Sequence, residues 1–141
     1  MEKLFILIAE DDEDDRFLLK AAFEENKFSD ELFFVENGME LLEYLHSQNR
    51  KNSVEKNPHF ILLDLNMPKK NGKEVLKEIK ANKVFCKIPI IIFSTTNNEQ
   101  EKKYCMELDA VAYFTKPVSY TDLISTVAEI RNIGSNSYKN R

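Results

Sequence analysis

The sequence contains no tryptophan, only two cysteines and no long apolar segment. Its longest purely apolar runs, residues 4–9 and 89–93, fall far short of the roughly 20 residues that a membrane-spanning helix needs. The N-terminus leads directly into the first of these runs, without the basic flank or the small-residue cleavage site of a signal peptide. We therefore expect a cytoplasmic protein that does not enter a membrane.

Cysteine pairs and an excess of basic charge are also missing. Cys86 and Cys105 form neither a close metal-binding pair nor a disulfide framework, so each is interpreted as a small buried hydrophobic residue. The 20 lysines and arginines are outnumbered by 24 aspartates and glutamates, which gives a formal net charge of −4. This sign disfavours binding to a phosphate backbone, so nucleic acid is not an expected partner.

The chain does contain a regular alternation of apolar runs and amphipathic segments. Its 141 residues, 43% of them hydrophobic, suffice for one domain with a proper core. The apolar runs have the continuous character of strands buried in a parallel sheet: residues 4–9, 31–35, 60–63, 88–93 and 111–114. Segments with helical spacing follow each run. The pattern predicts an α/β fold, a doubly wound five-stranded parallel sheet with five helices.

Capping residues mark four helix starts. Each has an N-cap residue followed three positions later by an acidic or amide residue: Asn37 with Glu40, Asn71 with Glu74, Asn97 with Gln100, and Ser119 with Asp122. The helix after Asn97 offers an apolar face only over residues 104–108, so we expect it to be loosely packed. Residues 47–58 are expected to form a long surface connection, and residues 134–141 a polar tail that frays.

Polar residues with related chemistry follow the predicted strands. Glu10 and Asp11 follow the first strand and Asp64 the third, while Ser94 ends the fourth and Lys116 follows the fifth. The carboxyl ends of parallel strands meet at one edge of a sheet, where ligands collect. Carboxylates about 4 Å apart repel by roughly 4 kcal/mol at an effective dielectric of 20, and one lysine cannot neutralise three of them. A divalent cation would neutralise the remaining negative charge, and the all-oxygen ligand set favours Mg²⁺.

These residue types indicate phosphoryl chemistry. A carboxylate beside a metal ion and a lysine can attack phosphorus, so Asp64 is a candidate nucleophile and Ser94 a candidate hydrogen-bond donor to the new phosphoryl group. The alternative interpretation of Asp64 is a turn-forming aspartate that caps the loop of residues 66–68. The acidic run of residues 12–15 is interpreted as a solvated helix start. His46 and His59 are interpreted as structural.

Four motifs occur together in a familiar order and spacing: Glu10-Asp11, the Leu62–Pro68 block, Ser94-Thr95, and the Tyr113–Pro117 block. In these motifs the chain resembles the receiver domain of two-component response regulators, the CheY-like family. The resemblance extends from residue 3 to about residue 132 and implies a flavodoxin-like (βα)5 receiver fold. It places a receiver domain at residues 1–133 and leaves residues 134–141 as a tail.

The resemblance also implies roles for the site residues. Asp64 would accept a phosphoryl group from a phosphohistidine on a sensor histidine kinase or a phosphotransfer protein, with Mg²⁺ present. The implied metal ligands are Asp11, Asp64, Glu10 directly or through water, and the backbone carbonyl of Asn66. Lys116 would hold the phosphoryl group, and the Lys116–Pro117 bond would be cis.

A conformational switch is implied in addition. Ser94 would turn toward the phosphoryl group and Tyr113 would turn inward, which would alter the face formed by the fourth helix, the fifth strand and the fifth helix. A partner protein, or a second copy of the chain, would bind to that face. The protein would thus be a phosphoacceptor switch that promotes its own phosphorylation and dephosphorylation, not an enzyme with a separate substrate. Residues 47–58 and 67–72 are similar to single-domain regulators paired with bacterial phytochrome kinases.

Three other functions fit parts of the pattern. A phosphatase of the haloacid dehalogenase class needs an aspartate two residues after its nucleophile, where this chain has Asn66. A carrier of flavin mononucleotide needs a loop that cradles phosphate, whereas the first loop here is acidic. A pseudo-receiver, a binding module that works without phosphorylation, remains the alternative, and loss of magnesium binding would favour it.

Overall fold

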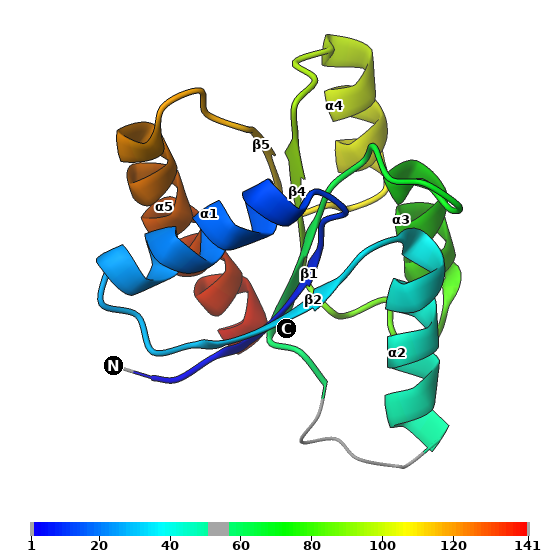
Figure 1. Ribbon diagram of the computed structural model, residues 1–141. Coiled ribbons are helices and arrows are strands. Elements are labelled where there is room, and N and C mark those ends of the chain that lie inside the picture. The colour runs from blue at the N-terminus through cyan, green and yellow to red at the C-terminus, as the bar shows by residue number, and fades with distance from the viewer. Residues whose placement is uncertain (1, 51–56, 141) are drawn as a thin grey trace.

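A computed structural model describes residues 2–50 and 57–140 of the chain (Figure 1). Its sheet has five parallel strands: β1 (Phe5–Ala9), β2 (Glu31–Val35), β3 (Phe60–Leu63), β4 (Ile90–Ser94) and β5 (Ala112–Thr115). Their order across the sheet is β2-β1-β3-β4-β5. The chain therefore winds outward from β1 in both directions, and the predicted doubly wound α/β fold is confirmed.

Five helices alternate with the strands: α1 (Glu13–Glu25), α2 (Gly38–Arg50), α3 (Gly72–Ala81), α4 (Glu99–Glu107) and α5 (Tyr120–Lys139). Helices α1 and α5 cover one face of the sheet, whereas α2, α3 and α4 lie on the other (Figure 1). None of the helices in residues 2–50 and 57–140 is long and apolar enough to cross a membrane.

The strands divide their side chains between two cores because successive residues point to opposite faces of the sheet. Leu7, Ile61 and Ile92 pack under α2, α3 and α4. Ile8, Leu62 and Phe93 pack under α1 and α5. The central strands β3 and β4 are buried along their whole length, which is why the sequence shows them as continuous apolar runs.

Three of the four predicted N-caps are confirmed by side-chain acceptors for a backbone N–H three residues later: Asn37 for Glu40, Asn71 for Glu74, and Ser119 for Asp122. The fourth prediction was wrong by one residue. Asn98 caps α4 and accepts from the N–H groups of Gln100 and Glu101. The Asn97 amide oxygen instead accepts a hydrogen bond from the hydroxyl of Thr115, 3.4 Å away, at the end of β5.

The predicted frayed tail is helical as far as Lys139. Gly134 is buried against the ring of Phe60, a contact so close that a Cβ at this position would overlap the ring. The ring of Tyr138 packs 4.4 Å from that of His59. The last turns of α5 are thus held by tertiary contacts, although their sequence is polar.

Two further expectations differ from the structure. Helix α2 continues to Arg50, so the connection expected at residues 47–58 begins later, and residues 51–56 lie outside the described part of the chain. Cys105 is buried as expected, whereas Cys86 is only half-buried. The Cys86 thiol lies 3.7 Å from the carbonyl of Lys83 in the turn after α3.

Candidate functional site

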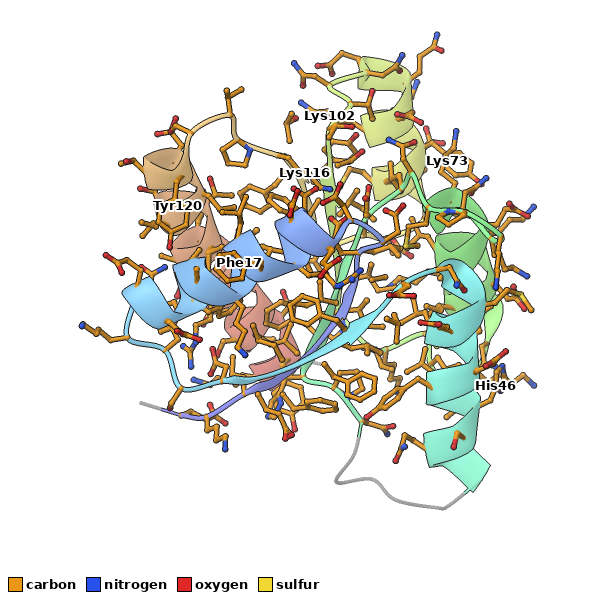
Figure 2. All side chains as sticks on the ribbon, in the orientation of Figure 1. Phe17, His46, Lys73, Lys102, Lys116 and Tyr120 are labelled. Atoms are coloured by element: carbon orange, nitrogen blue, oxygen red, sulfur yellow. The ribbon has the colours of Figure 1, made fainter. Side chains whose placement is uncertain are left out.

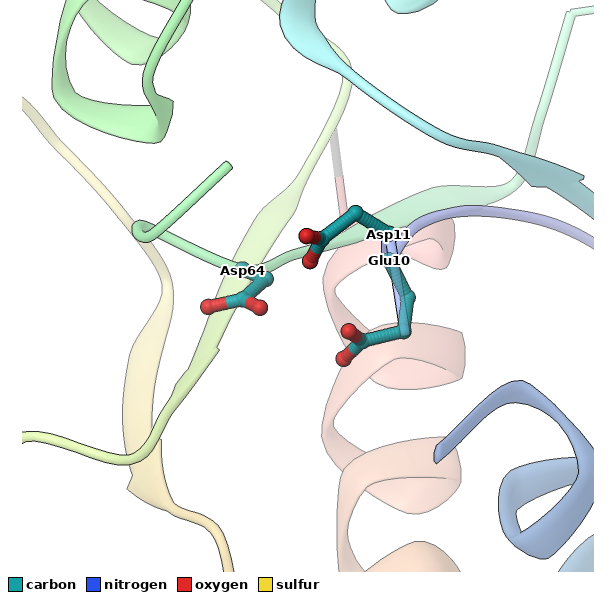
Figure 3. A group of neighbouring side chains, drawn as sticks. All are labelled: Glu10, Asp11 and Asp64. Carbon is teal, nitrogen blue, oxygen red and sulfur yellow. The ribbon is translucent and has the colours of Figure 1, made fainter. Parts of the chain in front are cut away.

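Three acidic side chains meet at the carboxyl edge of the sheet (Figure 3). Glu10 and Asp11 follow β1, and Asp64 follows the neighbouring strand β3, where its N–H donates to the carbonyl of Ala9 at 3.1 Å. One carboxylate oxygen from each of the three residues lies within 4.8 Å of the others. Glu10 and Asp64 are only 1% and 4% exposed, whereas Asp11 is open to solvent.

A glycine lets α3 begin directly behind the phosphoacceptor candidate. The Gly72 N–H donates to the carbonyl of Leu65 at 2.9 Å. A Cβ on Gly72 would lie 2.5 Å from the carbonyl oxygen of Asp64, too close for any other residue. The Asn66 N–H donates to Oδ1 of Asp64 at 3.1 Å, which fixes one carboxylate oxygen and leaves the other to face the site.

Lys116 supplies the positive charge of the site. Its backbone N–H donates to the carbonyl of Ser94 at 2.7 Å, which holds the end of β5 beside the end of β4. Its Nζ donates to three carboxylates: Glu10 Oε1 at 2.6 Å, Asp15 Oδ2 at 3.1 Å and Asp64 Oδ2 at 3.2 Å. Figure 2 shows Lys116 beside the N-terminal end of α1.

Burial and charge shift the protonation of this cluster. Burial raises the pKa of Glu10 to about 7, although the hydrogen bond and the charge of Lys116 act in the opposite direction. Burial also raises the pKa of Asp64 above its usual value against the charge of Lys116. Burial alone would lower the pKa of Lys116, but its hydrogen bond to Glu10 and the charge of Asp64 outweigh burial and raise it.

The cluster fits a hard divalent cation. Glu10, Asp11 and Asp64 carry three negative charges when ionised, and Lys116 offsets one of them. The ligand atoms are carboxylate oxygens, which suit Mg²⁺, Mn²⁺ or Ca²⁺ better than zinc or copper. The backbone carbonyl of Asn66 remains a predicted fourth ligand.

Ser94 and Tyr113 lie on the side of the site toward α4. Ser94 is fully buried at the end of β4, and its hydroxyl accepts from the N–H of Thr96 at 3.4 Å. The half-buried Tyr113 donates its hydroxyl proton to the carbonyl of Thr96 at 2.9 Å. Burial raises the pKa of Tyr113, against a hydrogen bond that involves Ser94. Both predicted switch residues therefore contact the same connection between β4 and α4.

Two site residues were missed by sequence reasoning. Within the acidic run of residues 12–15, Asp12 is the N-cap of α1 as a solvated helix start requires, but Asp15 pairs with Lys116. Nη1 of Arg16 donates to the carbonyls of Glu10 and Asp11, both at 3.0 Å. A helix that begins immediately after β1 must place its first turn at the same sheet edge, and this signal was present in the sequence.

The peptide bond between Lys116 and Pro117 is trans, so the expected cis bond was wrong. Trans is the ordinary preference of such bonds by about 0.5–1 kcal/mol. The two histidines lie outside the site, as expected. The His59 Nδ1 accepts from the N–H of Phe5 at 2.9 Å, and the His46 ring packs 5.1 Å from that of Phe85.

Comparison with known proteins assigns the chain to a family. The model of the response regulator receiver domain matches residues 6–128. The chain belongs to the response regulator receiver domain family. Receiver domains are the phosphoacceptor switches of two-component systems, so membership in the family accounts for buried carboxylates gathered around a lysine.

Relatives support the assignment along nearly the whole chain. The response regulator Rcp1 of Synechocystis is 34% identical over 127 residues, which cover 90% of this chain and 86% of that protein. The crystal structure of Rcp1 with Mn²⁺ bound has a TM-score of 0.81, with 35% identity and 92% of each chain covered. The structure of the phosphorylated cyanobacterial phytochrome response regulator RcpA has a TM-score of 0.83, with 33% identity and 93% of each chain covered.

Proposed function

We propose that this receiver accepts a phosphoryl group on Asp64 from a phosphohistidine of a sensor histidine kinase or a phosphotransfer protein. One observation carries the proposal: the Asp64 carboxylate faces Lys116 Nζ at 3.2 Å within a cluster of carboxylates that fits a divalent cation. A buried carboxylate in a structural role would be paired with a cation and screened from further acids. Here Asp64 shares its cation with other carboxylates.

The transfer uses groups of this chain at stated atoms. An oxygen of Asp64 attacks phosphorus, a P–O bond forms, the P–N bond of the phosphohistidine breaks, and the imidazole leaves with the electron pair and takes up a proton. Lys116 donates hydrogen bonds to the oxygens that gain charge, and Ser94 turns its hydroxyl toward one of them. Dephosphorylation is a separate step, in which water attacks phosphorus, the P–O bond to Asp64 breaks, and the carboxylate is regenerated with release of inorganic phosphate.

Mg²⁺ is the proposed metal, held by Asp11, Asp64, the backbone carbonyl of Asn66, and Glu10 directly or through water. When bound, it would offset negative charge on the carboxylates and on the phosphoryl oxygens. The acidic cluster supports this proposal, as does the Mn²⁺ in the structure of the similar regulator Rcp1. Burial raises the pKa of Glu10 and that of Asp64 in spite of Lys116, so a bound cation would favour their ionised forms.

Signal output is proposed to leave through the face of α4, β5 and α5. Thr96 links the two switch residues, since it contacts the hydroxyl groups of both Ser94 and Tyr113. A turn of Ser94 toward the phosphoryl group removes its contact with Thr96 and frees Tyr113 to move inward. A partner protein or a second copy of this chain then binds the changed face.

The source of the phosphoryl group is proposed to be a phytochrome-type kinase in the cytoplasm. RcpA, a phytochrome response regulator, supports this subgroup. So does the bacteriophytochrome response regulator RtBRR, at 33% identity with a TM-score of 0.74 and 92% of this chain covered. If a light-regulated kinase phosphorylates this protein to different extents in red and far-red light, the result would support this source. Equal phosphorylation in both kinds of light would count against it.

Intact mass spectrometry tests the proposed function. The wild-type protein and Asp64→Asn are incubated with phosphoramidate, with and without Mg²⁺. We expect one phosphoryl group on the wild type, only with Mg²⁺, and none on the variant. If neither protein is modified, the chain is a pseudo-receiver that binds its partners without phosphorylation.

A further inference from the structure

Asp15 is a third carboxylate on Lys116, and it stands outside the residues that the receiver motifs assign. Its Oδ2 lies 3.1 Å from Nζ, closer than Oδ2 of Asp64 at 3.2 Å. The side chain of Asp15 is 39% exposed, whereas those of Glu10 and Asp64 are 2% and 5% exposed. Asp15 is therefore the partner of Lys116 that solvent reaches most easily.

The geometry of α1 holds Asp15 in this position. The N-cap Asp12 accepts from the N–H of Asp15 at 3.0 Å, which fixes the first turn of the helix against the sheet edge. This bond uses the backbone of Asp15 and leaves its carboxylate free to reach Lys116. The carboxylate of Asp15 thus reaches the ammonium from α1, whereas that of Asp64 reaches it from the end of β3.

An ammonium group has three N–H donors, and Lys116 gives all of them to carboxylates. A phosphoryl group on Asp64 would present new acceptors at the same place. With Asp15 in contact, one donor stays engaged on the helix side. Without that contact, Lys116 has two donors to give to the phosphorylated residue.

The side chain of Lys116 has room to move when its donors change partners. A cavity of about 50 Å³ lies beside its stem, with Leu18 on α1, Phe93 on β4 and Pro117 after β5 among its walls. The Phe93 ring centroid is 6.0 Å from Nζ, at the outer limit of a cation–π contact, so this ring does little to hold the ammonium in place.

We infer that Asp15 is a positioning residue that competes with the phosphoryl group on Asp64 for the donors of Lys116 and so shortens the life of the phosphorylated state. The inference rests on the proposed function. It also gives Asp15, in the first turn of α1, a role distinct from metal binding, because Asp15 acts through Lys116.

The test compares Asp15→Asn with Asp14→Asn. The two variants remove the same charge from the same helical turn, but Asp14 is exposed and makes no ion pair with any residue of the described ranges. Each protein is phosphorylated with phosphoramidate and Mg²⁺, the donor is removed by desalting, and the phosphorylated fraction is followed by intact mass. We expect phosphate loss to slow by about threefold to fivefold in Asp15→Asn, the range for a half-exposed pair, and to stay near the wild-type rate in Asp14→Asn.

A second readout separates positioning from a structural role. The ¹⁵N resonance of the Lys116 ammonium in the unphosphorylated protein should shift in Asp15→Asn and keep its position in Asp14→Asn. Asp15→Glu, which restores the charge, should return the lifetime toward that of the wild type. If Asp15→Asn does not fold, Asp15→Ser removes the same charge and repeats the comparison.

The outcomes are distinguishable. Normal phosphorylation with equal lifetimes in the wild type and Asp15→Asn overturns this inference and leaves the proposed function standing. Equal slowing in Asp14→Asn and Asp15→Asn also overturns it, because the effect would then come from overall charge. No phosphorylation of the wild type overturns the proposed function and this inference together.

Discussion

Helices α4 and α5 flank the same edge strand, but the protein holds them very differently. Helix α5 buries Leu123, Val127, Ile130, Arg131 and Gly134. Of the nine residues of α4, all of them described, only Cys105 is buried. Tyr104 and Met106 of α4 are 39% and 45% exposed. Apolar burial therefore fixes α5, whereas α4 is held mainly by polar contacts.

The polar contacts of α4 are few and lead toward the site. Glu101 pairs with Lys73 at the start of α3 at 3.3 Å, and Lys102 lies 5.8 Å from the ring centroid of Tyr113. Both contacts are partly exposed, so each contributes little to stability. An element with little apolar burial opens at low free-energy cost. The firmly packed helix α5 thus serves as a rigid frame, whereas the loosely packed α4 can respond to changes at the site.

The largest expected effect comes from breaking the polar anchor of α5. Arg131 donates to Asp30 at 2.6 Å and 3.0 Å, and the Asp30 side chain is fully buried. Arg131→Met leaves that buried carboxylate without its cation, with only the N–H of Leu4 as a donor among the described residues, and should lower the free energy of unfolding by about 3–5 kcal/mol in urea denaturation. Lys139→Met is the control, because its pair with Glu2 is exposed at 3.8 Å. A cost below about 1 kcal/mol for Arg131→Met would show that α5 is not anchored by this pair.

The acidic site at the carboxyl edge of the sheet should make stability depend on pH and metal. The pKa of Glu10 is about 7 in the folded protein against 4.5 ordinarily, and that of Asp64 is raised as well. The folded state then binds protons more tightly than the unfolded chain between these values. Without metal, the free energy of unfolding should thus fall as pH rises from 5 to 7.5, by about 1–3 kcal/mol.

Calorimetry at the two pH values checks this dependence. Saturating Mg²⁺ should stabilise the protein more at pH 7.5 than at pH 5, because protons compete with the cation for the same carboxylates. In Asp64→Asn the fall with pH should be smaller, since the charge of Asp64 contributes to the raised pKa of Glu10. If the stability of the metal-free protein rises from pH 5 to 7.5, the pKa values of Glu10 and Asp64 are not raised in the folded state.

Removal of the Tyr113 hydroxyl should loosen α4 and leave α5 unchanged. Tyr113→Phe deletes the hydrogen bond to the carbonyl of Thr96, at a cost of about 1 kcal/mol. Hydrogen exchange should become faster in residues 96–107 and stay the same in residues 120–139. Equal acceleration of both helices would mean that α4 and α5 open together, in spite of their different packing.

The smallest expected effect tests the link between α3 and α4. Lys73→Met removes the pair with Glu101 and should cost less than about 1 kcal/mol, because the pair is partly exposed. Faster hydrogen exchange in α4 is the sensitive readout. Lys77→Met, an exposed position on the same helix, provides the matched control. If both variants change α4 equally, the ion pair does not hold it.

Sequence reasoning recovered the fold and the centre of the site for a shared physical reason. The buried strands appear as continuous apolar runs, and parallel strands bring their carboxyl ends to one edge. Glu10, Asp64 and Lys116 follow three such runs, so their meeting could be predicted without coordinates. The weak apolar face of α4 was equally visible, because loose packing follows from the composition of that segment.

The misses depend on tertiary geometry. The choice of Asn98 over Asn97 as an N-cap depends on where the chain leaves β4. The helical tail after Gly134 depends on the ring of Phe60, which lies far away in the sequence. The helix start after β1 placed the first turn of α1 at the site, but which acid of that turn reaches Lys116 depends on the position of Asp15 on the helix.

The central claim is that Asp64 carries the phosphoryl group, and chemical trapping tests it most directly. An aspartyl phosphate is reduced by borohydride to homoserine, a mass change that peptide sequencing assigns to one position. After phosphorylation in Mg²⁺ and reduction, we expect homoserine at position 64 and unmodified carboxylates at positions 10, 11 and 15. Homoserine at any of those three positions, or at none of the four, would contradict the account.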